Sequence, residues 1–359
     1  MQYNNNQNYY NQQKPNFSGS YYQPPVGQPY QPGFNAQSAA YLRRKRDINE
    51  LISAGFIIGA VIVIYLIMQI IAVTVLSVMG LNDIYSSSSL FQNCFNIVAV
   101  HLFSLTIPFG IMALILKKRF TGPIIPSEKI GFVKGFMWVS VGMGCCLLAN
   151  IITNYVIALF KVFGYELTQS ELLNVDSPIA CIALVFSTAI VPGVCEEFAM
   201  RCCTLGVLKK YGKGFAVFAV SVVFGLIHGN IIQFIFAFLV GLALGYITVK
   251  TNNIVPAMFV HGLNNGLSVI SDIFEYAISR DFADNAITVI YIAWIVLSVI
   301  GLIYLIFKKE LLPAKKGKKP GEPYALSFGT KLLCLLPGFF VPFLILIYMS
   351  VKTIVPIAS

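Results

Sequence analysis

The sequence predicts an all-α fold, a polytopic membrane bundle of eight or nine transmembrane helices. Charged residues make up only 11% of the 359 residues, and hydrophobic residues make up 57%. A soluble domain usually has about 25% charged residues. The chain also contains nine apolar runs, and a spanning helix needs roughly 20 mostly apolar residues. Much of the surface must therefore face lipid.

The apolar runs are separated by short polar segments. In chain order they lie at 51–79, 94–116, 135–160, 178–205, 214–228, 231–249, 254–276, 287–307 and 328–350. The short run at 214–228 is joined to the next by Gly229-Asn230, which predicts a helical hairpin, with a broken helix as the alternative. The loops are too short to form a soluble domain, and no internal repeat is evident.

The N-terminal 41 residues are rich in Asn, Gln, Tyr and Pro and lack an apolar core. Such a segment cannot bury enough apolar surface to fold, so we expect disorder. It also lacks the apolar core of a signal peptide, so the first span is expected to act as the membrane signal. The predicted regions are a disordered cytoplasmic tail that ends in a basic cluster (1–46), transmembrane helices 1–3 (47–176), a central region of helices with polar residues (177–276) and C-terminal transmembrane helices with a basic loop (277–359).

The net charge of +10 does not indicate nucleic-acid binding, because the lysines and arginines lie between the apolar runs. With the N-terminus in the cytoplasm, 21 of the 25 basic residues fall on the cytoplasmic side and 3 on the other. The positive-inside rule favours this orientation, with an odd number of spans and the C-terminus outside. The eight cysteines lie in apolar runs and show no spacing typical of disulfides or zinc ribbons.

Three neighbouring apolar runs contain a cluster of polar residues. Its members are Glu196, Glu197, Arg201, His228, His261, Asn264 and Asn265. Ionisable residues within a membrane are costly and therefore indicate function. Taken singly, an ion pair or a core histidine is often structural, but the grouping of these residues within about 70 positions favours a functional site.

Spacing predicts how the first of these residues divide their roles. Glu197 and Arg201 are four residues apart and can pair on one helix face. Glu196 lies about 100° around the helix axis from Glu197, so its side chain points in a different direction. Because adjacent carboxylates do not both ionise easily in a low dielectric, the arginine leaves Glu196 as a tunable acid or base.

The histidines have neighbours at helical spacing. His261 and Asn265 share one face, and Phe224 lies on the same stripe as His228. A carboxylate, two imidazoles and an amide can together activate a water and hold an oxyanion. They could equally bind a divalent metal through Glu and His ligands.

The same residues resemble the motifs of the CPBP family, which includes CAAX prenyl endopeptidases and bacteriocin-processing or immunity proteins. Glu196-Glu197-Phe198-Ala199-Met200-Arg201 is similar to its EExxxR motif, Phe224-Gly225-Leu226-Ile227-His228 to FxxxH, and His261-Gly262-Leu263-Asn264-Asn265 to HxxxN. The motifs occur in order on successive spans. The resemblance covers roughly 177–276, which is under a third of the chain.

The resemblance implies a catalytic role for six residues. Glu196 would be the general base, assisted by His228; Glu197 and Arg201 would orient the site; His261 and Asn265 would stabilise the oxyanion. The family has been described both as metalloproteases and as glutamate-dependent proteases. The cofactor thus stays open: a divalent metal such as zinc would use Glu196, His228 and His261, although no HExxH pair is present.

The implied function is an intramembrane endopeptidase that cleaves a membrane-embedded or membrane-proximal peptide. Its partners would be such a substrate and the lipid bilayer, without nucleic acid. We expect a multi-pass protein of a bacterial plasma membrane with a cytoplasmic N-terminus. The alternatives are a non-enzymatic immunity or scaffold protein and, less favoured because no inverted repeats are evident, a proton-coupled transporter. The sequence does not indicate the substrate.

Overall fold

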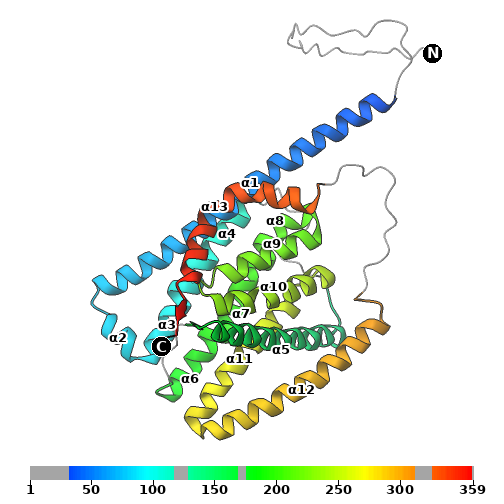
Figure 1. Cartoon of the computed structure of the whole chain (residues 1–359). Coiled ribbons are helices and arrows are strands. Elements are labelled where there is room, and N and C mark those ends of the chain that lie inside the picture. Colours follow the sequence, from blue (N-terminus) through cyan, green and yellow to red (C-terminus); the bar gives the residue numbers. More distant parts are fainter. Residues whose placement is uncertain (1–31, 117–127, 169–174, 312–325, 358–359) are drawn as a thin grey trace, which may run out of the picture.

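A computed structural model describes residues 32–116, 128–168, 175–311 and 326–357 (Figure 1). Nearly all of these residues are helical, which confirms the predicted all-α membrane bundle. The helices are α1 (Pro32–Val78), α2 (Asn82–Ser87), a helix over Ser89–Ile115, α5 (Phe132–Val162), a helix over Pro178–Tyr211, α9 (Lys213–Leu226), α10 (Ile231–Thr251), α11 (Val255–Ala277), α12 (Arg280–Phe307) and α13 (Phe328–Val351).

Seven of the described helices are long and apolar enough to cross a membrane. They are α1, Ser89–Ile115, α5, Pro178–Tyr211, α10, α12 and α13. Helix α9 has only 14 residues, and α11 contains the polar residues His261, Asn264 and Asn265. These last two helices belong to the bundle, and α11 carries part of the polar cluster.

Several helices begin where a polar side chain can cap the free backbone N–H groups. The side chains of Ser88, Ser177, Asn230, Ser279 and Ser327 each accept a hydrogen bond from a backbone N–H in the first turn. Such caps stabilise a helix start by about 1 kcal/mol each. The starts of these helices are therefore determined by the capping residues next to them.

Helix α1 begins well before the first apolar run. The sequence analysis expected disorder up to residue 46, but the structure is helical from Pro32 onward, so this expectation is wrong for 32–46. Pro32 suits the first helical position, and Ala39, Ala40 and Leu42 are strong helix formers. The basic cluster therefore lies on a helix. The tail before Pro32, also expected to be disordered, lies outside the described residues.

A small sheet joins two helix ends that are far apart in the sequence. Strand β1 (Tyr165–Leu167) pairs antiparallel with β2 (Ile354–Pro356), with Glu166 opposite Val355. The sequence analysis expected no strands. Because β1 follows α5 and β2 follows α13, these two helices end on the same side of the bundle.

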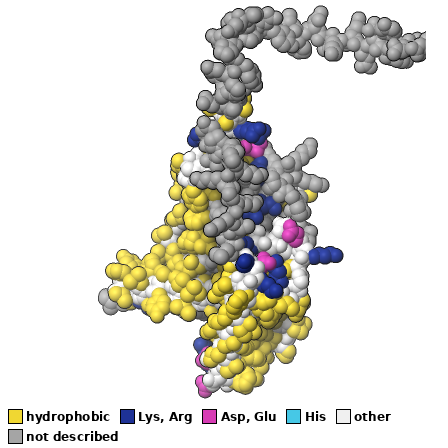
Figure 2. Space-filling view, turned by 90° about the vertical axis from the view of Figure 1, so that its right-hand side faces the viewer, with side chains coloured by type: hydrophobic (Ala, Val, Ile, Leu, Met, Phe, Trp, Pro, Cys, Tyr) yellow, Lys and Arg dark blue, Asp and Glu magenta, His cyan; other side chains and the backbone are white. Residues whose placement is uncertain are grey.

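Basic residues mark the other side of the bundle. Lys210 Nζ lies 2.7 Å from Glu50 Oε2, which brings the end of the helix Pro178–Tyr211 to α1. Lys134 Nζ lies 2.7 Å from Glu310 Oε1, which brings the start of α5 to the end of α12. We call this side the basic face; Figure 2 shows lysines and arginines gathered there beside hydrophobic flanks. The side of the β1–β2 sheet is the opposite face.

Helices α1 and α13 cross at glycines. A Cβ at Gly338 would collide with the backbone at Gly55, and a Cβ at Gly59 would collide with the backbone at Gly338. Small residues let two membrane helices approach until their backbones touch, which increases van der Waals packing. The crossing therefore depends on the absence of these side chains.

We expect Gly338→Ala to lower the midpoint of thermal unfolding by several degrees, because the added methyl group separates the two backbones. Gly329→Ala, in the same helix, is the matched control: nothing lies within 4 Å of its Cβ position. Replacing a helical glycine by alanine otherwise gains up to about 1 kcal/mol. Equal midpoints for the two detergent-purified variants would contradict the proposed close crossing.

Candidate functional site

Wide helical turns position the polar cluster. The helix Pro178–Tyr211 contains two π-helical segments, η3 (Val185–Ile190) and η4 (Phe198–Thr204), on either side of α7 (Val191–Glu197). Within η4, Thr204 Oγ1 donates to the carbonyl of Ala199, five residues back, at 2.9 Å. Such segments are rare and frequently occur at functional sites. They rotate the side chains that follow them relative to a regular α-helix.

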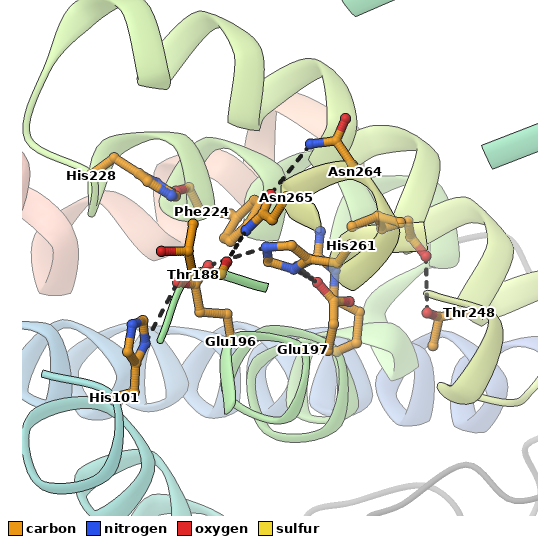
Figure 3. A network of polar contacts seen from close by, with 12 residues as sticks. His101, Thr188, Glu196, Glu197, Phe224, His228, Thr248, His261, Asn264 and Asn265 are labelled. Atoms are coloured by element: carbon orange, nitrogen blue, oxygen red, sulfur yellow. Dashed lines mark hydrogen bonds and ion pairs between the residues drawn. The ribbon is translucent and has the colours of Figure 1, made fainter. Parts of the chain in front are cut away.

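Glu197, Arg201 and His261 form a buried polar core. Glu197 Oε1 accepts from Arg201 Nη1 and from His261 Nδ1, each at 2.8 Å (Figure 3). All three residues are buried; Glu197 is 0% exposed. The pair predicted from the four-residue spacing is present. Because the carboxylate faces Nδ1, this nitrogen carries a proton and Nε2 is directed elsewhere.

Phe224 connects this core to α9. The guanidinium carbon of Arg201 lies 4.5 Å from the centroid of the Phe224 ring. The same ring packs edge-on against His261, with 5.8 Å between centroids, and against His228, with 5.2 Å. Arg201 Nε and Nη2 have no hydrogen-bond partner among the described residues. The cation–π contact with Phe224 therefore offsets part of the cost of burying the guanidinium charge.

Glu196 points away from Arg201. Its Oε2 lies 3.7 Å from His261 Nε2, and its Oε1 lies 3.9 Å from His101 Nδ1 (Figure 3). Both distances are too long for hydrogen bonds. Within the described chain, Oε2 is buried without a hydrogen-bond partner. The two adjacent carboxylates therefore differ, as the spacing predicted: one is paired with a cation, and the other is available to a ligand.

His101 was missed by the sequence analysis. It lies in η1 (Asn96–Thr106), a π-helical segment of the helix Ser89–Ile115, and faces Glu196. The signal was present, because a histidine inside an apolar run is as costly as the two that were considered. It was overlooked because it lies about a hundred positions from the cluster and belongs to none of the three motifs.

His228 lies at the turn between α9 and α10. Its Nδ1 lies 2.7 Å from the carbonyl oxygen of Phe224, which can only accept, so Nδ1 carries a proton. In the neutral ring, Nε2 is then free to accept. Gly229 follows with φ +67°, and Asn230 caps α10. The turn confirms the predicted helical hairpin.

The hairpin turn is supported by the C-terminal segment. The backbone N–H of Ile231 donates to Thr353 Oγ1 at 3.2 Å, just before β2. The side chain of Met349, near the end of α13, lies close against Gly229. The position of His228 is therefore set both by the short helix before it and by residues near the end of the chain.

Asn265 is oriented by two contacts. Its Nδ2 donates to the carbonyl of Thr188 in η3 at 3.0 Å, and its Oδ1 accepts from Asn264 Nδ2 at 3.3 Å. The amide nitrogen has a second N–H. Asn265 and His261 both line the same cavity, as expected from their shared helix face.

A cavity of about 1100 Å³ contains the site. Its inner wall includes Glu196, His101, His228, His261 and Asn265. Phe236, Ala237, Val240 and Val269 add apolar surface. The site can therefore hold an extended peptide segment next to a carboxylate, three imidazoles and an amide.

The proposed metal ligands do not fit a metal site in this arrangement. In the described part of the chain, no three His, Cys, Asp or Glu side chains converge closely enough to hold an ion. The Nδ1 atoms of His228 and His261 contact Phe224 and Glu197, which leaves only their Nε2 atoms as possible ligands.

We expect Arg201→Ala to destabilise the fold by roughly 3–5 kcal/mol, because it leaves Glu197 buried without its cation. Lys210→Ala, in the same helix, is the matched control. It removes a partner of Glu50 at the edge of the bundle, where ion pairs contribute about 1 kcal/mol or less. Thermal unfolding of both variants in detergent tests this expectation. Similar losses of stability in the two variants would show that the buried pair stabilises the fold no more than the pair at the edge does.

The chain matches no curated protein and no solved structure at a significant level. Its residues 178–267 match the sequence model of a family described as type II CAAX prenyl endopeptidase Rce1-like. The matched segment contains all three motifs and every cluster residue apart from His101. The resemblance predicted from the motifs is thereby confirmed: this part of the chain is similar to the Rce1-like type II CAAX prenyl endopeptidases.

Proposed function

We propose that the protein is an intramembrane endopeptidase in which Glu196 activates the attacking water. The observation that carries the proposal is the division between the two carboxylates. Glu197 is held by Arg201 and His261 through Oε1 and does not line the cavity, whereas Glu196 lines the cavity and makes no hydrogen bond to the described residues. A general base must have a free basic oxygen within reach of water. The similarity to a membrane peptidase family supports this reading.

The reaction begins with a substrate carbonyl in the cavity. Glu196 takes one proton from the water, and the water oxygen bonds to the carbonyl carbon, so that the carbonyl electron pair moves onto its oxygen. His228 Nε2 can accept a hydrogen bond from the same water and orient it. When the C–N bond breaks, protonated Glu196 returns the proton to the leaving amine.

The oxyanion needs hydrogen-bond donors that reach the carbonyl oxygen while the water attacks the carbonyl carbon. The second N–H of Asn265 is one candidate, because its first N–H is held by Thr188. His261 is the other, and it must carry a proton on Nε2 to donate. Glu197 Oε1 lies 2.8 Å from Nδ1 and Glu196 Oε2 lies 3.7 Å from Nε2, so a proton on either nitrogen has a carboxylate nearby. Preorganised donors of this kind supply a large share of catalysis.

His101 is a positioning residue in this scheme. It lies beyond hydrogen-bonding distance of Glu196 Oε1, and it approaches from a helix outside the matched family segment. A polar group there can hold the carboxylate toward the water rather than toward the apolar wall. The role is distinct from that of His228, which lies at the hairpin turn.

The central test is Glu196→Gln, which keeps the shape of the side chain but removes the basic oxygen. We expect Glu196-dependent cleavage to fall by about 100- to 10,000-fold. The fold should survive, because a neutral amide costs less to bury than a carboxylate. The measurement compares membrane peptides from cells with the wild-type protein, Glu196→Gln, or the exposed-strand control Glu166→Gln. Unchanged peptides in Glu196→Gln would favour the immunity or scaffold alternative.

For His101→Asn we expect a smaller loss of cleavage than for Glu196→Gln, with thermal stability unchanged. The decisive variant combines both changes. If His101 acts through Glu196, the double variant should be no less active than Glu196→Gln alone, because coupled residues are not additive. Additive losses would show that His101 acts independently of Glu196, and a lower unfolding midpoint for His101→Asn would assign it a structural role.

A further inference from the structure

The cavity runs in one direction from the site. Along α11 its lining starts at His261 and continues to Tyr276 in the last turn, a distance of roughly 22 Å at 1.5 Å per residue. In the helix Pro178–Tyr211, the lining residues start at Leu184 and stop at Glu196. Both sets lie in the part of the helix that leads away from the basic face.

The exposure of the lining increases in the same direction. His261 is buried, Asn265 is half-buried, and Ser268, Asp272 and Glu275 are exposed. Exposed carboxylates on this wall must be in water, because lipid offers them no hydrogen bonds. The outer part of α11 is therefore the mouth of the cavity, and His261 and Glu196 lie at its inner end.

The mouth lies on the opposite face, where α11 turns into α12 and where the β1–β2 sheet lies. Among the described residues, the basic residues at this face are Lys161, Arg280 and Lys352. One of them, Arg280, lies 3.2 Å from Glu275 and 3.6 Å from Asp284. By the positive-inside rule, the face that is poor in lysine and arginine is the extracytoplasmic one.

We infer that the substrate enters the site from the extracytoplasmic face. Its class is then a peptide segment that lies outside the cytoplasm or in the outer half of the membrane, such as part of an exported or membrane-anchored protein. A segment confined to the cytoplasmic surface would meet the basic face, on the other side of the buried Glu197–Arg201 pair. The inference concerns the substrate of the proposed peptidase and so rests on that proposed function.

Cysteine labelling in intact cells tests the access side. The background is the full chain with Cys94, Cys145 and Cys181 replaced by alanine, because the other five cysteines are buried. Ser268→Cys places a thiol inside the mouth without touching the catalytic residues. Lys213→Cys, at the exposed start of α9 on the basic face, is the matched control. The probe is a charged, membrane-impermeant maleimide.

We expect Ser268→Cys to react in intact cells and Lys213→Cys to react only after the membrane is permeabilised. The reverse pattern, or a Ser268→Cys thiol that requires permeabilisation, would overturn the inference. Labelling is repeated with Glu196→Gln, which removes cleavage but not access. Labelling from outside without Glu196-dependent cleavage would contradict the proposed function alone. Glu196-dependent cleavage with no labelling from outside would contradict the access side alone.

Discussion

The buried contact of Glu197 with Arg201 and His261 determines the rest of the site. A carboxylate with no exposure to solvent needs a cation, and Arg201 supplies it from the next turn of the same helix. The same oxygen holds His261, so α7 and α11 are joined at the level of the cavity floor. The adjacent Glu196 and the Phe224 ring, which packs against both Arg201 and His261, are placed relative to this contact.

The contact also separates the chemistry of two neighbouring residues. An isolated pair of carboxylates would share protons, and neither would have a defined role. Here Glu197 is bound through Oε1 to Arg201 and His261 and does not line the cavity, so of the two carboxylates only Glu196 is offered to the cavity. The π-helical segments on both sides of α7 allow this, because they change the direction of the side chains that precede and follow the pair.

Local patterns made much of this predictable. The Glu197–Arg201 pair follows from a spacing of four on a helix, and the α9–α10 hairpin follows from Gly229-Asn230 between two apolar runs. The predicted proximity of His228 and His261 is mediated by Phe224, which packs against both rings. Each of these features depends on residues that are close together in the sequence or that belong to one of the three motifs.

The features that sequence reasoning missed depend on contacts between distant segments. His101 meets Glu196 only because the helix Ser89–Ile115 packs beside α7, and β1 exists only because the chain end returns to pair with it. The helical extension of α1 was missed for a different reason: the composition of the tail as a whole outweighed the helix-forming residues at its end.

The support of the α9–α10 turn by the C-terminal segment has a practical consequence for handling the protein. Thr353 and Met349 contact Ile231 and Gly229, which follow His228 in the turn. A fusion partner or affinity tag joined at this end would extend from the segment that supports the turn. We therefore expect even an inert extension there to perturb the position of the His228 ring.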